Sequence, residues 1–227
     1  MSETNIDESS HDDDPSTRQS ESRDFSAPLG KLKSGRLVFA SGASRIRLKG
    51  NRMMGNLYRA RFERYVPSVW THEETLTLKY PSPPIFDHPL DWRLPQAEIT
   101  LNGSIPWEIG FHNGVSQLKA SLGELPLQSL DILGGANQIE LTLGKPDGAA
   151  YIYVSGGIRN ATIRRPAGVG LRVQVSGSIN KLVFDDQHLE AASVEARLES
   201  PSFDRATSRY DLCIAGGASL LTIEQEK

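Results

Sequence analysis

The chain has 227 residues, of which 38% are apolar and 7% aromatic, and it contains 20 Gly and 13 Pro. This composition is typical of many short strands joined by tight turns around an aliphatic core, and the length suits one all-β domain. The formal net charge is −3, and the single cysteine, Cys213, excludes an intramolecular disulfide and a cysteine-only metal cluster. Neither a signal peptide nor an apolar run long enough to cross a bilayer is recognisable, so we expect a cytoplasmic protein.

We expect residues 1–28 to form a disordered acidic tail. This segment is rich in Ser, Asp and Glu, carries eight acidic residues against two basic ones, and has too few apolar side chains to offset the entropy cost of ordering. Residues 29–227 hold the other 20 acidic and 23 basic residues and are therefore weakly basic. The tail either aids solubility, folds back on a basic face of the domain, or docks on a partner.

A glycine-centred unit of about 21 residues recurs along residues 29–227. Its centres at Gly134, Gly156 and Gly177 are 22 and 21 residues apart, and Asn113 takes the equivalent place one unit earlier. Self-similarity at a fixed period is the signature of a repeat architecture. The units are, in chain order, 37–48, 111–122, 130–143, 152–163, 173–184 and 212–223.

Within each unit, apolar and polar residues alternate on both sides of the glycines. Leu171 and Val173 face inward while Arg172 between them faces outward, and this period of two predicts strands. A turn containing proline and glycine follows the unit, as at 145–148 and 165–168. Strand, glycine corner, strand and turn together predict a single-domain β-solenoid in which consecutive units stack as consecutive coils, and the glycines serve as corners where a Cβ atom would be obstructed.

Two insertions interrupt the period, at about 53–96 and 185–209. The first carries most of the aromatic residues, a predicted strand at 75–80 and a proline-rich passage that must be extended or turning. The second fits either a short helix over 189–198 or an extended flap, and periodicity does not decide between them.

Several segments, in this order and spacing, resemble the toast-rack domain family. This family is the C-terminal β-solenoid of LiaF-like and PspC-associated bacterial cell-envelope stress proteins, and it is related to adhesin-like domains. The resemblance implies a right-handed solenoid without known catalysis, used for sensing or protein contacts in envelope stress. Its best-known members have transmembrane helices that this chain lacks, so no binding residue is carried over. The segments are Asp91-Trp-Arg-Leu-Pro95, Ile105-Pro-Trp-Glu-Ile109, the Gly-Gly corners, Arg165-Pro-Ala-Gly-Val-Gly170, Leu198-Glu-Ser-Pro-Ser-Phe203 and Ala215-Gly-Gly-Ala-Ser-Leu220.

Motifs for catalysis are missing from the sequence. There is no metalloprotease helix motif, no nucleophile elbow, no Cys-x-x-Cys pair, and no glycine pattern for nucleotides. His88 and His188 lie near aspartates but lack further ligands at a metal-binding spacing, and Cys213 faces away from the core as an inert thiol. We therefore expect no enzyme, no cofactor and no metal ion, with a carbohydrate-active β-helix as the least favoured alternative.

Two groups of residues are candidates for contact with other molecules. Basic residues at outward positions of consecutive units predict a stripe that binds a partner, an acidic lipid or the tail, although ordinary solvated surface is the simpler interpretation. Three tryptophans predict either an aromatic cap over the end coil or a ligand pocket. The stripe is Arg159, Arg164, Arg165, Arg172 and Lys181, and the tryptophans are Trp70, Trp92 and Trp107.

These observations favour a non-catalytic binding or sensing module in bacterial envelope-stress signalling. Its expected partner is a protein such as a membrane-associated stress regulator, while nucleic acid is disfavoured by a pI near 6.0. Self-association is left open, because a structural scaffold that assembles end to end, as bactofilin solenoids do, is the alternative.

Overall fold

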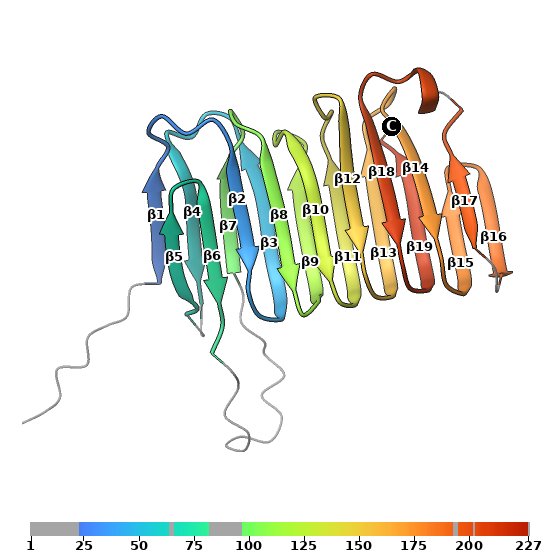
Figure 1. Cartoon of the computed structure of the whole chain (residues 1–227), viewed down its shortest axis with the longest axis horizontal. Coiled ribbons are helices and arrows are strands. Elements are labelled where there is room, and N and C mark those ends of the chain that lie inside the picture. Colours follow the sequence, from blue (N-terminus) through green and yellow to red (C-terminus); the bar gives the residue numbers. More distant parts are fainter. Residues whose placement is uncertain (1–22, 64–65, 82–96, 193–194, 202, 227) are drawn as a thin grey trace, which may run out of the picture.

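The computed structural model describes residues 23–63, 66–81, 97–192, 195–201 and 203–226. They form two β-sheets that enclose one elongated core (Figure 1). The ten-stranded sheet has the order β1 (Asp24–Pro28), β4 (Asn56–Phe62), β7 (Ala97–Asn102), β3 (Ala43–Asn51), β9 (Val115–Leu122), β11 (Ala136–Leu143), β13 (Ile158–Arg165), β19 (Ala218–Gln225), β15 (Ile179–Phe184) and β16 (Gln187–Ala192). The nine-stranded sheet has the order β17 (Ala196–Glu199), β14 (Gly170–Val175), β18 (Arg209–Ile214), β12 (Ala149–Val154), β10 (Leu127–Leu133), β8 (Trp107–His112), β2 (Gly35–Phe39), β6 (Thr75–Lys79) and β5 (Ser68–His72).

Each predicted unit is one coil with one strand in each sheet, so the prediction of a β-solenoid is confirmed. In the coil of β10 and β11, alternate residues such as Leu130, Ile132, Ile139 and Leu141 are buried between the sheets. Equivalent strands of neighbouring coils pair in parallel, for example β11 with β9 and with β13. The core is therefore a continuous aliphatic column, as the composition predicts.

The glycine corners stack directly on one another. The Gly156 N–H donates to the Gly134 carbonyl at 3.0 Å, and the Gly216 N–H donates to the Gly156 carbonyl at 3.2 Å. A Cβ atom on Gly156 would lie 2.6 Å from the Gly134 carbonyl oxygen, and one on Gly216 would lie 2.5 Å from the Gly156 carbonyl carbon. Close backbone approach between coils thus explains these glycines, as the sequence predicts.

The order of the coils along the axis differs from the prediction. The last unit, β18 and β19, lies between β12–β13 and β14–β15 in both sheets, so these two coils are not neighbours although they are consecutive in sequence. The Gly177 N–H accordingly donates to Gly216 at 3.1 Å and not to Gly156. All of these units share one pattern, so the pattern itself does not distinguish the two orders.

Antiparallel strands flank both ends of the stack. At one end β4 pairs with β1 and β7, and β5 with β6. At the other end β16 pairs with β15 and β17 with β14, while a short 3-10 helix, η1 (Phe203–Arg205), precedes β18. The described part of the second insertion is therefore extended and not an α-helix.

Residues 24–28, which we expected to belong to a disordered segment, form a strand. Residues 1–22 lie outside the described residues, but 24–28 form the edge strand β1, and Phe25 packs edge-on against Phe62 with ring centroids 5.7 Å apart. Phe25 and Ala27 pack against the core. The mean composition of residues 1–28 does not indicate these two apolar contacts. Within the described ranges, no helix has the length and apolar character needed to cross a membrane.

Candidate functional site on the ten-stranded sheet

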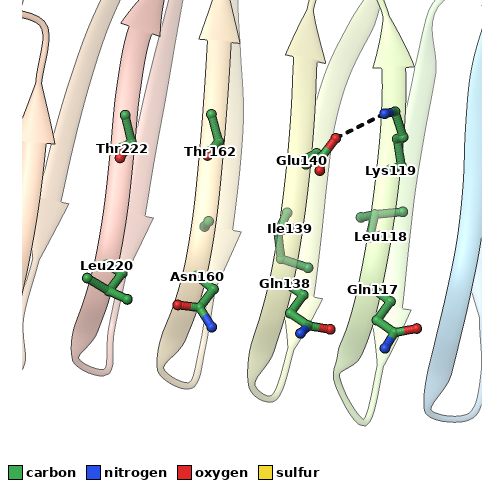
Figure 2. Close-up of a pocket in the computed structure, with 11 residues that line it drawn as sticks. Gln117, Leu118, Lys119, Gln138, Ile139, Glu140, Asn160, Thr162, Leu220 and Thr222 are labelled. Carbon is green, nitrogen blue, oxygen red and sulfur yellow. Dashed lines mark ion pairs between the residues drawn. The ribbon is translucent and has the colours of Figure 1, made fainter.

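The outer face of the ten-stranded sheet carries a regular lattice of side chains, because equivalent positions of adjacent coils lie in register. Within this lattice two hollows cross several strands, with volumes of about 630 Å³ and 660 Å³. The first hollow runs over β9, β11, β13 and β19, close to the corners (Figure 2). We call this first hollow the amide groove, because it is lined by Gln117, Gln138 and Asn160 together with Lys119, Glu140, Thr162, Leu220 and Thr222.

A local break in the alternation recurs in β3, β9, β11, β13 and β19, and four of these strands form the amide groove. In β11, Asn137 and Gln138 both lie between buried Ala136 and buried Ile139, so the strand places an extra residue on its outer face. Gln138 has φ 56°, in the left-handed region. The same conformation recurs at Arg45 (φ 52°), Gln117 (φ 52°), Asn160 (φ 51°) and Leu220 (φ 56°).

Leu220 is the unusual member of this column. Asn accepts the left-handed conformation readily, whereas for other L-residues it costs about 1–2 kcal/mol. The Leu220 side chain is also 48% exposed, so burial does not compensate for that cost. Figure 2 places Leu220 beside Asn160, at the end of the row of amides. Backbone strain and exposed apolar side chains occur at functional sites, so Leu220 marks this hollow as a candidate binding surface.

Charged groups in the amide groove neutralise each other. Lys119 Nζ lies 3.2 Å from Glu140 Oε2, and Thr162 and Thr222 continue this row across β13 and β19 (Figure 2). At the other end of the column, Arg45 Nε donates to Gln117 Oε1 at 3.0 Å. The groove therefore offers amide and hydroxyl groups and the exposed apolar side chain of Leu220, which suits polar contacts with a polypeptide.

The predicted basic stripe does not form one surface. Arg165 is fully buried and bound to Asp185, because it lies at the end of β13 where the chain turns over the core, so its predicted outward direction is wrong. Arg172 lies on β14 of the other sheet, with Nε 2.5 Å from Asp211 Oδ1, a hydrogen bond that raises the pKa of the guanidinium. Arg164 pairs with Glu224 at 2.8 Å and Lys181 with Glu190 at 3.5 Å.

Arg159 is the member of the stripe that stays exposed without an ion pair to a described residue. It lies in β13 and lines the second hollow together with Asn137. The Asn137 Oδ1 atom is buried and has no hydrogen-bond partner among the described residues.

The two described tryptophans, Trp70 and Trp107, lie apart in the nine-stranded sheet. Trp107 is fully buried in β8, its Nε1–H donates to the Asn102 carbonyl at 2.8 Å, and its ring occupies the place where a Cβ atom of Gly35 would lie. Trp70 is 51% exposed on β5, an edge strand separated from β8 by β6 and β2. Trp92 lies outside the described residues. Trp107 is therefore part of the core, and Trp70 lies on an exposed edge strand.

The column of left-handed residues is the feature that the sequence analysis does not predict. Each unit contains two consecutive polar or exposed residues where strict alternation would have one, as in Asn137-Gln138 and Ser116-Gln117. This repeated break in the period of two signals an irregular strand, although it does not indicate the hollow on the outer face.

Comparison with known proteins agrees with this architecture. The family model described as the N-terminal domain of toast_rack, DUF2154, matches residues 15–164. A crystal structure titled as that of a "putative cell adhesion protein" from Clostridium sporogenes superposes with a TM-score of 0.65 and 17% identity, covering 89% of this chain and 99% of that one. At this identity the superposition supports the fold alone. A search of curated proteins found no match.

Proposed function

Because this chain belongs to the family described as the N-terminal domain of toast_rack, DUF2154, we propose that it is a non-catalytic module that binds a protein partner in bacterial cell-envelope stress signalling. The adhesion-type title of the structural neighbour is compatible with a binding role. We place the partner on the amide groove and expect it to be a membrane-associated stress regulator met in the cytoplasm.

Leu220 is the observation that supports the amide groove as the partner-binding surface. A side chain that is strained, half-exposed and apolar stabilises neither the backbone nor the core, so its value lies in a contact made outside the fold. The neighbouring amides Gln138 and Asn160 surround such a contact with hydrogen-bonding groups, which matches the apolar centre and polar rim of protein interfaces.

The test is Leu220→Asn. Asparagine tolerates the left-handed conformation, so we expect the free energy of unfolding to stay the same or rise by up to about 1 kcal/mol. Retention of the partner in affinity purification from the native bacterium under envelope challenge should fall by about fivefold or more, since a central interface residue contributes about 1 kcal/mol or more.

Leu133→Asn is the matched control. Leu133 is 45% exposed at the end of β10, on the nine-stranded sheet, and has no left-handed conformation. This variant should retain the partner. Equal loss of the partner in both variants would contradict the proposed surface, and recovery of no envelope-stress protein by the wild-type chain would contradict the proposed role.

The grooves provide little support for glycoside hydrolysis. That chemistry uses two carboxyl groups facing each other about 5–10 Å apart. In the amide groove the described carboxylate is Glu140, which is bound to Lys119. In a smaller hollow, Asp24 and Glu98 lie on β1 and β7 with Arg61 of β4 between them in the register.

End-to-end assembly as a scaffold is also less well supported. At one end of the stack, the outermost strands β16 and β17 carry charged residues such as Glu190 and Arg197, which discourage strand pairing between molecules at that end. We therefore expect a monomer at high concentration in sedimentation experiments, and filaments would favour the scaffold.

A further inference from the structure

Two neighbouring rows of outward side chains cross the β1 end of the ten-stranded sheet. In the first row acids and bases are equal in number, and two of its ion pairs join Arg47 to Glu98 at 3.0 Å and Lys119 to Glu140 at 3.2 Å. This row therefore neutralises itself. Following the strand register, it consists of Asp24, Arg61, Glu98, Arg47, Lys119 and Glu140.

The second row holds cations and hydroxyl groups but no acid. Arg59 donates to Asn56 Oδ1 at 3.1 Å and 3.2 Å, and neither Arg59 nor Lys49 forms an ion pair with a described residue. Both side chains line a hollow of about 260 Å³. We call this the cationic row; it consists of Ser26, Arg59, Thr100, Lys49 and Ser121.

The chemistry of the cationic row indicates an anionic ligand with several carboxylate or phosphate oxygens. Guanidinium and ammonium groups bind such oxygens through charge-assisted hydrogen bonds, and hydroxyl groups between them add further donors. Arg59 and Lys49 are two strands apart, a separation of roughly 10 Å, so a ligand with a single carboxylate does not span them.

An acidic segment of the chain joins the domain beside this row. Residues 1–22 contain seven Asp or Glu and one Arg. They lead into Arg23, whose carbonyl accepts from the Phe62 N–H at 2.9 Å, and then into β1, which contains Ser26 of the row. Twenty-two residues can reach at most about 70 Å when extended, several times the width of the row.

We propose that residues 1–22 dock on the cationic row and cover it. A covalently attached ligand acts at an effective concentration of about millimolar, so the segment has an advantage over free anions of similar charge. The docked segment would then compete with any acidic partner for this end of the sheet, which is distinct from the amide groove over β9 to β19.

Zero-length carbodiimide coupling of the full chain tests the docking, because it joins a carboxylate to a lysine amine only when the two are in contact. In the monomer at 0.1 M salt we expect Lys49 to be coupled to the acids of residues 3–21, and exposed Lys145, on the turn after β11, to serve as the uncoupled reference. The yield should fall steeply toward 1 M salt, where the Debye length is about 3 Å.

Arg59→Gln should lower the Lys49 coupling by about two- to fivefold, the range expected for one exposed ion pair. Arg36→Gln, which alters a similarly exposed arginine on the nine-stranded sheet, should not change it. Replacing the acidic triplet by D12N/D13N/D14N should lower it by about tenfold. Coupling that is equal at Lys49 and Lys145, insensitive to Arg59→Gln, or confined to dimers would overturn the proposal.

Phosphatidylglycerol vesicles test the competing occupant, a lipid surface. If the acidic segment covers the row, D12N/D13N/D14N should bind the vesicles several-fold more strongly than the wild-type chain, because it uncovers Arg59 and Lys49. Vesicle binding that requires Arg59 but is the same with and without the triplet would assign the row to lipid headgroups and overturn the proposal.

Discussion

The buried ion pair of Arg165 and Asp185 joins the ends of β13 and β15, the two strands on either side of β19. Arg165 ends β13, Asp185 follows β15, and β19 lies between these two strands. Arg165 Nη1 and Nη2 donate to the two carboxylate oxygens at 2.9 Å and 2.6 Å, and Nε donates to the Val169 carbonyl at 3.1 Å. The guanidinium also lies 5.6 Å from the ring centroid of Phe184. The pair therefore spans the end of β19.

The two partners differ in exposure, and this difference sets the expected cost of removing each one. The Arg165 side chain is 0% exposed and that of Asp185 is 23% exposed. Asp185→Asn keeps the shape and tolerates φ 51°, but leaves a buried guanidinium uncompensated, which should cost about 3 kcal/mol of unfolding free energy. Arg165→Met leaves a carboxylate that water can reach and should cost about 1–2 kcal/mol.

Urea unfolding followed by circular dichroism and by tryptophan fluorescence measures both costs, provided that the two probes give the same transition. Arg47→Met, which breaks the exposed pair with Glu98, is the control and should cost less than about 1 kcal/mol. The double variant should be less destabilised than the sum of the single variants. A larger loss for Arg165→Met than for Asp185→Asn would refute the reasoning from exposure.

Two further variants test the corners and the buried tyrosine. Gly216→Ala should lower the free energy of unfolding in the same urea titration by about 1–3 kcal/mol, because the added Cβ atom would lie 2.5 Å from the Gly156 carbonyl carbon. Gly123→Ala is the control and should have little effect, because there is open space around Gly123. The Tyr210 hydroxyl donates to the Gly144 carbonyl at 2.9 Å, and burial raises the pKa of this hydroxyl. The stability that neutral Tyr210 gives the fold is therefore complete below the unfolded-state pKa of about 10 and is lost as the pH rises above it. Tyr210→Phe should therefore cost about 1 kcal/mol at pH 7 but lose less stability than the wild type between pH 10 and 12, and an unchanged alkaline slope in pH-dependent melting would contradict this assignment.

Much of the solenoid was predictable because its physical causes are local and repeated. Alternation fixes which residues of a strand face the core, and close approach of the corners requires Gly156 and Gly216 wherever coils stack. Edge strands are harder to predict. In β1, two apolar residues, Phe25 and Ala27, suffice to order the strand against β4, and composition averaged over 28 residues conceals them.

The candidate surfaces were less predictable, because they depend on which strands are neighbours. Arg59 and Lys49 lie 10 positions apart in the sequence, but they face the same hollow because β7 enters between their strands from residue 97. Asn160 and Lys181 have equivalent places in consecutive units, yet β19 lies between their strands. A stripe inferred from consecutive repeats is valid only when chain order and stacking order are the same.

The position of the last coil has a consequence for how the fold is completed. In the described structure, β14 and β15 pair with β18 and β19 and with the flanking strands β17 and β16, but not with β12 or β13. The strands within residues 170–184 therefore join the rest of the stack through those within residues 209–225, which lie between them and β12 and β13. Contacts within this end of the solenoid are consequently less local than in a stack built in chain order, and the Arg165–Asp185 pair joins β13 to the residue after β15 across the end of β19.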